Sequence, residues 1–184
     1  VYDTSIIGDL TLNNTGTIAI VDSGDLHVSN GILNNQFGGI VDLQENNGNI
    51  SYSGSGSHVF NNYGTLKKSV STGAAAVQCT LLNTGVISIE SGTMVLQSAN
   101  ATLDGGIYNV AAGTFLTWDG TVNLSGTLSG TISGAINWTS VVSVASSALL
   151  DFSGDGFVDW SYSALTGGGV LTNDFTINLT SVYD

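Results

Sequence analysis

The sequence contains no arginine, no proline and a single cysteine, and its only lysines are the adjacent Lys67 and Lys68. Charged residues make up 9% of the 184 residues, and the formal net charge is −12. Nucleic-acid binding depends on basic side chains that displace the counterions of the phosphates, so this composition excludes a nucleic-acid partner. Anionic membranes repel such a chain for the same reason, and we expect no membrane insertion.

The lone cysteine, Cys79, excludes a disulfide bond within the chain. It alternates with Val77 and Leu81, which predicts a buried and inert thiol, with a reactive or cross-linking thiol as the alternative. Large stacked β-structures have extended hydrogen-bonded cores and need no disulfide bonds, so their absence does not argue for a reducing compartment.

No stretch has the periodicity of an amphipathic helix. Gly, Ser, Thr and Asn recur about every 6–10 residues, and the segments between them alternate apolar with polar residues in the manner of β-strands. Proline removes a hydrogen-bond donor and survives mainly on edge strands, so its absence favours strands that are paired on both sides. Hydrophobic residues make up 42% of the chain, which is enough for a buried core. The sequence therefore predicts an all-β protein.

One unit recurs along the chain, with an apolar residue two places before an asparagine and another four places after it. The copies are centred on Asn14, Asn35, Asn62, Asn83 and Asn173, and Asp104 replaces the asparagine in a sixth copy. The anchors are 21 residues apart at 14–35, 62–83 and 83–104. They are 27 apart at 35–62, where the polar run 53–58 is expected to form an extra loop.

A spacing of about 21 residues fits one coil of three short strands and three turns, as in a parallel β-solenoid. Asparagine tolerates the left-handed backbone of a sharp turn, and stacked asparagine amides can hydrogen-bond to one another. We therefore expect a structural Asn ladder at the five anchors, whereas a general preference of Asn for turns is the alternative. Between residues 111 and 170 the phase is hard to follow, and the sequence assigns no coils there.

The tripeptide Val-Tyr-Asp occurs at 1–3 and again at 182–184. This predicts that residues 1–184 form a single β-solenoid segment and one unit of a tandem array with a period of about 181 residues. Asn14 of a following copy would then lie 22 residues after Asn173, which is one coil. At about 4.8 Å per coil, the segment forms a rod about 40 Å long whose ends meet neighbouring repeats.

The pattern Asn-x-Gly-[Thr/Val]-apolar-x-apolar alternates with Ser-Gly-Thr-Met-Val-Leu at 91–96 and Asp-Gly-Thr-Val-Asn-Leu at 119–124. It resembles the β-helix repeats of large bacterial surface adhesins and autotransporter-like passengers, over most of residues 8–132 and again at 168–180. The resemblance implies a right-handed parallel β-helix, secretion and an extracellular role at a cell surface. It implies no catalytic residue.

Asp151, Ser153, Asp155 and Asp159 have the spacing of the first part of an EF-hand loop, which raises a Ca²⁺ site. Ser153 replaces an acidic ligand of that motif, and Tyr162 stands where the motif has glutamate. The alternative is a Gly-rich turn between strands at 149–152 and 157–160, and we expect that turn and no resident cofactor.

Other constellations give weaker indications. His27 and His58 lie far apart without a zinc motif, and the pairs Asp22/Asp25 and Asp151/Asp155 offer acid and base groups for glycoside hydrolysis only in principle. Seven aromatic residues are expected to pack in the core and along the stack, with a sugar-stacking strip as the alternative: Trp118, Trp138, Trp160, Tyr2, Tyr52, Tyr162 and Tyr183. The sequence thus predicts a non-enzymatic structural or adhesive repeat. The alternatives are a module that binds surface glycans or Ca²⁺ and, less favoured, a polysaccharide-degrading enzyme.

Overall fold

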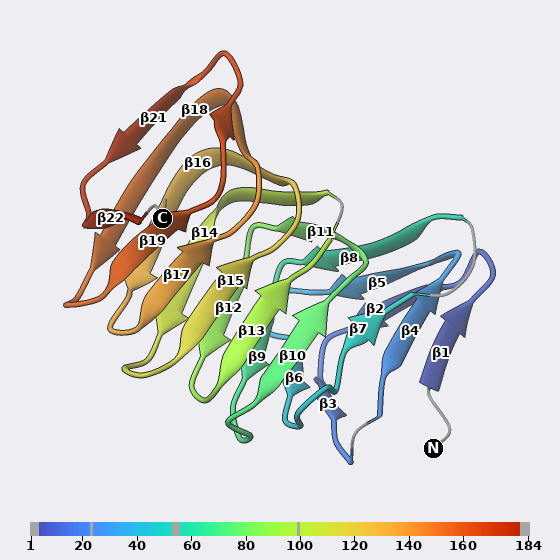
Figure 1. Ribbon diagram of the computed structural model, residues 1–184. Coiled ribbons are helices and arrows are strands. Elements are labelled where there is room, and N and C mark those ends of the chain that lie inside the picture. Colours follow the sequence, from blue (N-terminus) through green and yellow to red (C-terminus); the bar gives the residue numbers. More distant parts are fainter. Residues whose placement is uncertain (1–3, 23, 53–55, 99, 181–184) are drawn as a thin grey trace.

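The structure, a computed structural model, describes residues 4–22, 24–52, 56–98 and 100–180. In those ranges the regular structure is β-strand, and the strand pairs are parallel. Successive coils are roughly 22 residues apart and stack into a β-solenoid of about 8 turns (Figure 1). The predicted fold class, an all-β parallel β-helix, is therefore confirmed. Both Val-Tyr-Asp segments lie outside the described residues.

One sheet forms a continuous face of the rod, and each described coil contributes one strand to it. The strands, in order along the rod, are β1 (Thr4–Ile7), β4 (Leu26–Ser29), β7 (Ile50–Ser51), β10 (Ala74–Val77), β13 (Thr93–Leu96), β15 (Phe115–Trp118), β17 (Ala135–Trp138), β19 (Phe157–Ser161) and β22 (Ile177–Thr180). Because β1 and β22 are the two edges of this sheet, they mark opposite ends of the rod (Figure 1).

The second sheet closes the coil, and in the N-terminal coils it has two short strands per coil with a corner between them. The strands before the corner are β2 (Thr11–Asn14), β5 (Gly31–Asn35), β8 (His58–Asn62) and β11 (Thr80–Asn83). The strands after it are β3 (Thr17–Ile20), β6 (Ile40–Leu43), β9 (Thr65–Lys68) and β12 (Val86–Ile89).

From β14 (Ala101–Val110) onward one long strand replaces the two short ones, because β14 pairs with β11 through its first half and with β12 through its second. β16 (Val122–Thr131) and β18 (Val142–Ser153) continue this arrangement, and β18 then pairs with the short strands β20 (Leu165–Thr166) and β21 (Val170–Asn173). The corner persists inside the long strands as register shifts, between Asp104 and Gly106 in the β14–β16 pair and between Leu124 and Gly126 in the β16–β18 pair. Gly105 and Gly126 each have a φ of 68°. These shifts replace the asparagine turn of the earlier coils, which is why the repeat is hard to follow in this part of the sequence.

Residues at equivalent positions of successive coils form rows along the rod, which we call columns. One column starts at the N-terminal end of the second sheet and reaches its C-terminal end. Its members are Leu12, Leu33, Phe60, Leu81, Ala101, Val122, Val142 and Leu165. The six inner members are buried, and columns of this kind together make up one apolar core that runs along the rod.

The three tryptophans occupy another column, in the C-terminal half of the first sheet. Trp118 and Trp138 are buried with ring centroids 5.2 Å apart and an interplanar angle of 20°, and the Trp138 and Trp160 centroids are 5.6 Å apart. Core packing is confirmed for Trp118 and Trp138, and Trp160 is partly buried against the core. It is wrong for Tyr52 and Tyr162, which are exposed, and Tyr2 and Tyr183 lie outside the described residues. The buried rings of Trp118 and Trp138 cannot form an exposed strip for sugar stacking.

Candidate functional site

The four residues of the predicted calcium loop lie in the turn that joins β18 to β19 and on both sides of it. Asp151 and Ser153 belong to β18 of the second sheet, Asp155 lies in the turn that follows, and Asp159 belongs to β19 of the first sheet. The Ser153 hydroxyl donates to the carbonyl of Gly130 at 3.1 Å, and the Asp159 carboxylate accepts a hydrogen bond from Thr180. In the described part of the chain, no three His, Cys, Asp or Glu side chains are grouped to hold a metal ion.

The turn itself is built for close stacking. A Cβ atom added to Gly154 would lie 2.4 Å from the carbonyl oxygen of Ile132, and one added to Gly156 would lie 2.3 Å from that of Gly134. The amide of Gly156 donates to the Ile132 carbonyl at 2.8 Å. Close packing against the preceding coil therefore explains why both positions are glycine, and no metal ion is needed for that explanation. The contacts favour the Gly-rich turn. Calcium binding stays a prediction of the sequence.

Four of the predicted ladder residues form one column at the corner of the second sheet. The side-chain amide of Asn14 donates to Asn35 at 2.8 Å, Asn35 donates to Asn62 at 2.8 Å, and Asn62 donates to Asn83 at 2.6 Å. Each of the three donors also reaches a backbone carbonyl of the next coil, at 3.0–3.1 Å. All the amides point their N–H groups toward the C-terminal end, so the ladder has a direction.

The ladder ends at Tyr108, and the sixth anchor was placed wrongly. Asn83 pairs in register with Leu103, whereas Asp104 lies one residue further on and is exposed. The amide of Asn83 instead donates to the Tyr108 hydroxyl at 3.1 Å, and that hydroxyl donates to the carbonyl of Gly105 at 3.1 Å. Burial raises the pKa of the Tyr108 phenol, so the hydroxyl stays protonated and available as a donor.

The structure does not bring Asn173 to the other four asparagines. Its register neighbour is Leu150. Leu150 belongs to the column that begins at Gly16, and this column lies after the corner, two positions beyond the ladder column. The Asn173 side chain bonds only within its own turn, to the backbone N–H and C=O of Phe175. Spacing alone misplaced it because a residue two positions away from the ladder column fits the same 21–22-residue period. The 22-residue step from Asn173 to a following Asn14 is therefore not a step along the ladder.

A second asparagine column, missed from the sequence, runs beside the first on the outer face. Asn34 donates to Asn13 at 2.8 Å, and Asn61 donates to Asn34 at 2.9 Å. The signal was the doublet Asn-Asn at 13–14, 34–35 and 61–62, whose first member faces outward because side chains alternate along a strand.

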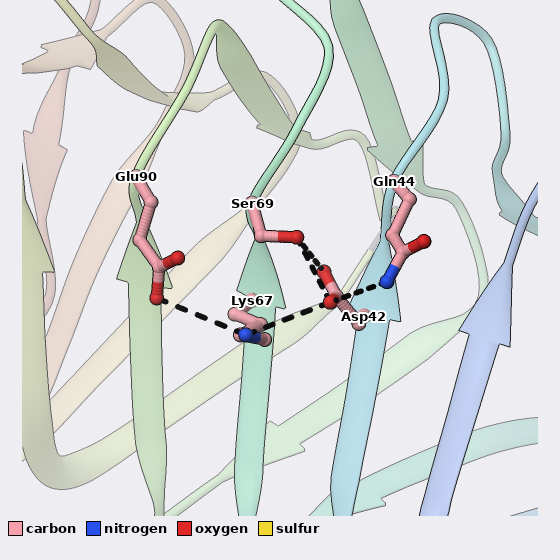
Figure 2. A network of polar contacts seen from close by, with 5 residues as sticks. All are labelled: Asp42, Gln44, Lys67, Ser69 and Glu90. Carbon is pink, nitrogen blue, oxygen red and sulfur yellow. Dashed lines mark hydrogen bonds and ion pairs between the residues drawn. The ribbon is translucent and has the colours of Figure 1, made fainter.

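A polar network joins three neighbouring strands on the outer face of the second sheet (Figure 2). The buried carboxylate of Asp42 accepts hydrogen bonds from Ser69 at 2.9 Å and from Gln44 at 3.0 Å. The Lys67 ammonium lies 3.6 Å from Asp42 and 4.0 Å from Glu90, and so links the coils of β6, β9 and β12. A buried carboxylate without partners is costly, and this network supplies the Asp42 carboxylate with hydrogen-bond donors and a cation. Because the partners come from neighbouring strands, the network favours the observed register of these strands.

Lys68 points to the inside, where it replaces an apolar residue in a core column. It pairs with Ile89 and is fully buried, and its ammonium donates to the carbonyl of Ser71 at 2.8 Å and to the Ser71 hydroxyl at 2.7 Å. Burial lowers the pKa of Lys68, against the opposing pull of Glu45 and Asp42. Of the two histidines, His27 contacts the Ser51 hydroxyl at 2.9 Å and His58 stacks on Tyr52 with ring centroids 3.9 Å apart.

The two ends of the rod expose the columns that are buried along its length. Leu12 and Leu165, the first and last members of one column, are 38% and 37% exposed. A second column starts at Thr4, passes through the tryptophans and ends at Leu179, which is 74% exposed. At the N-terminal end a hollow of about 400 Å³ opens between the sheets. Its lining is Thr4, Ile18, Ala19, Ile20, Val21, Asp22, Gly24, Asp25 and Leu26.

Comparison with protein-family models, with curated proteins and with solved structures gave no match. No helix long and apolar enough to cross a membrane occurs among the residues that the structure describes.

Proposed function

We propose that this chain is a structural module of an extended rod or filament at a cell surface, without a catalytic role. The single observation that carries the proposal is the state of the two ends. Within the described residues, apolar columns that are buried through the rod become exposed at both edges, where β1 and β22 each pair with one neighbouring strand. Such edges pair readily with further strands, so a rod of this kind is completed by coils that continue it in both directions.

The interior of the rod supports the same function. The Asn14–Asn83 ladder joins coils in the N-terminal half of the rod, and the tryptophan stack joins coils in the C-terminal half. Apolar columns extend along the rod axis through both halves. Stability in such a fold is a sum of nearest-neighbour contacts between coils, so the length of the rod can change without redesign of the core. This property suits a spacer that holds an adhesive or enzymatic element away from a surface.

The extracellular location is supported by the repeat pattern, which resembles surface adhesins and autotransporter-like passengers. The neutral surface rich in Ser, Thr, Asn and Gly is consistent with it. A tandem array with a period of about 181 residues would supply the coils that meet each end.

Antibodies raised against the purified chain test the proposal on intact cells of the source organism. We expect labelling of non-permeabilised cells, with the label on extended fibres in electron micrographs. Deletion of the segment should shorten those fibres by about 40 Å per copy, because about 8 coils rise about 4.8 Å each. Labelling only after permeabilisation would overturn the proposal.

A further inference from the structure

The N-terminal edge of the rod is complementary to its own C-terminal edge. The column of Leu12 ends at Leu165 and the column of Thr4 ends at Leu179, so a second copy placed on the rod axis continues both columns. Parallel strands have the same direction at both edges of a sheet. A second copy therefore pairs in parallel only when its C-terminal edge meets an N-terminal edge.

The side chains at the two edges also fit in shape. Leu179 projects from the last strand of the first sheet, and its column continues onto Thr4, which lines the hollow at the N-terminal end. At that end the space next to Gly16 is open, because a Cβ added to it meets nothing within 4 Å. In the next coils the preceding coil fills this space, since a Cβ on Gly39, Gly64 or Gly85 would lie 2.3–2.4 Å from one of its carbonyl oxygens. Gly16 thus leaves space for a further coil at this edge.

We propose that separate copies of this chain associate head to tail, with Leu179 of one copy over the N-terminal hollow of the next. This inference rests on the proposed rod function and names its partner as a second copy of the chain. The contact is heterologous, so it leaves one open edge on each side and generates filaments rather than closed dimers.

Charge sets the conditions for this association. The N-terminal end contains Asp9, Asp22 and Asp25, and the C-terminal end contains Asp174, while both lysines lie in the middle of the rod. The two edges therefore repel each other at low salt. We expect association to strengthen when ionic strength rises from about 0.02 M to about 0.5 M, as the Debye length falls below the separation of the charges.

Two variants test the geometry, because each blocks one edge. Leu179→Asp places a charge on the C-terminal edge, and Gly16→Val places a branched side chain on the N-terminal edge. Ala112→Val is the matched control, since Ala112 is exposed in a turn on the side of the rod. Sedimentation velocity at high salt should show polymers for the wild type and for Ala112→Val, and monomers for each edge variant alone.

An equal mixture of the two edge variants decides the polarity. Each variant retains the edge that the other has lost, so the mixture should form 1:1 dimers that grow no further. Dimers of Leu179→Asp alone would indicate contact between two N-terminal edges, and dimers of Gly16→Val alone would indicate contact between two C-terminal edges. Either result overturns the inference, as does a wild type that stays monomeric at every salt concentration. A monomeric wild type leaves the rod function to the cell-surface test, because covalently linked repeats need no such contact.

Discussion

At the scale of single residues, the chain depends on side-chain amides that are buried and fully bonded. A buried amide without partners costs about 1–3 kcal/mol, whereas one in a ladder satisfies its own donors and the acceptors of the next coil. Asn62 is the clearest case. It accepts from Asn35 and donates both to Asn83 and to the carbonyl of Val86.

Asn62→Ala should lower the free energy of unfolding by about 2–4 kcal/mol, since it leaves the amides of Asn35 and Asn83 without their ladder partner. Urea titration followed by circular dichroism measures the change. Two controls separate the ladder from general effects of asparagine. Asn61→Ala, on the outer face of the same strand, and Asn173→Ala, outside the ladder column, should each cost less than about 1 kcal/mol. A cost for Asn173→Ala equal to that of Asn62→Ala would contradict the register found here.

The buried thiol makes a pH-dependent contribution to stability. Burial raises the pKa of Cys79 to about 12 from 9.0, so the thiol is harder to ionise in the folded chain than in the unfolded one. Its stabilising contribution is therefore fully present below pH 9 and is lost as the pH rises toward 12. The slope is about 1.4 kcal/mol per pH unit.

The lowered pKa of Lys68 has the opposite effect on stability, because it makes the fold more stable as the pH rises to 10.5. Comparison of the wild type with Cys79→Ala cancels this effect, since both proteins contain Lys68. The stability advantage of the wild type should be constant below pH 9 and should shrink steadily above it. Urea unfolding at about pH 8 and about pH 11 gives both values. An unchanged difference at the two pH values would show that the thiol is accessible to solvent.

At the scale of elements, the turn after the Asn column depends on glycines that let one coil lie directly on another. Gly39, Gly64 and Gly85 each face the backbone of the preceding coil, and a side chain there would force the coils apart. The same column at Gly16 has no coil beneath it. Position within the rod, and not the local sequence, decides whether the glycine is required.

Gly85→Ala should therefore cost about 2–4 kcal/mol, because its Cβ would lie 2.3 Å from the carbonyl oxygen of Gly64. Gly16→Ala, the same substitution in the same column, should be neutral or stabilising by up to about 1 kcal/mol, since it restricts only the unfolded chain. Urea midpoints of the two variants at low protein concentration measure the contrast. Equal losses would mean that the N-terminal coil is already covered in solution.

At the scale of the whole molecule, stability should vary along the rod. Among the described strands, inner coils have a neighbour on each side, whereas the coils of β1–β3 and β20–β22 have one each, so we expect them to open locally at lower free energy. Hydrogen exchange should be at least about tenfold faster in the backbone amides of 4–20 and 165–180 than in those of 80–130. Mass spectrometry of the dilute Leu179→Asp variant measures this without filament contacts. Uniform protection from end to end would contradict an open rod and indicate a single cooperative unit.

The sequence by itself determined the strand class, the coil length and the Asn column from Asn14 to Asn83. These features follow from local alternation, from turn chemistry and from a repeat short enough to be read as a period. The buried thiol and the core tryptophans could be predicted in the same way, because alternation along a strand assigns each residue to a face.

Only the tertiary structure decided which residues share a column once the corner had changed from an asparagine turn to a glycine bulge. Asp104 and Asn173 fit the period but lie one and two positions away from the ladder, since a bulge or a longer turn shifts the register without changing the spacing by much. The exposed apolar edges, the space beneath Gly16 and the network around Asp42 depend on contacts between residues about 22 or more positions apart. Those contacts exist only after the chain has wound upon itself, which is why the sequence could predict the coil and the stacking of repeats but not the residues exposed at each end.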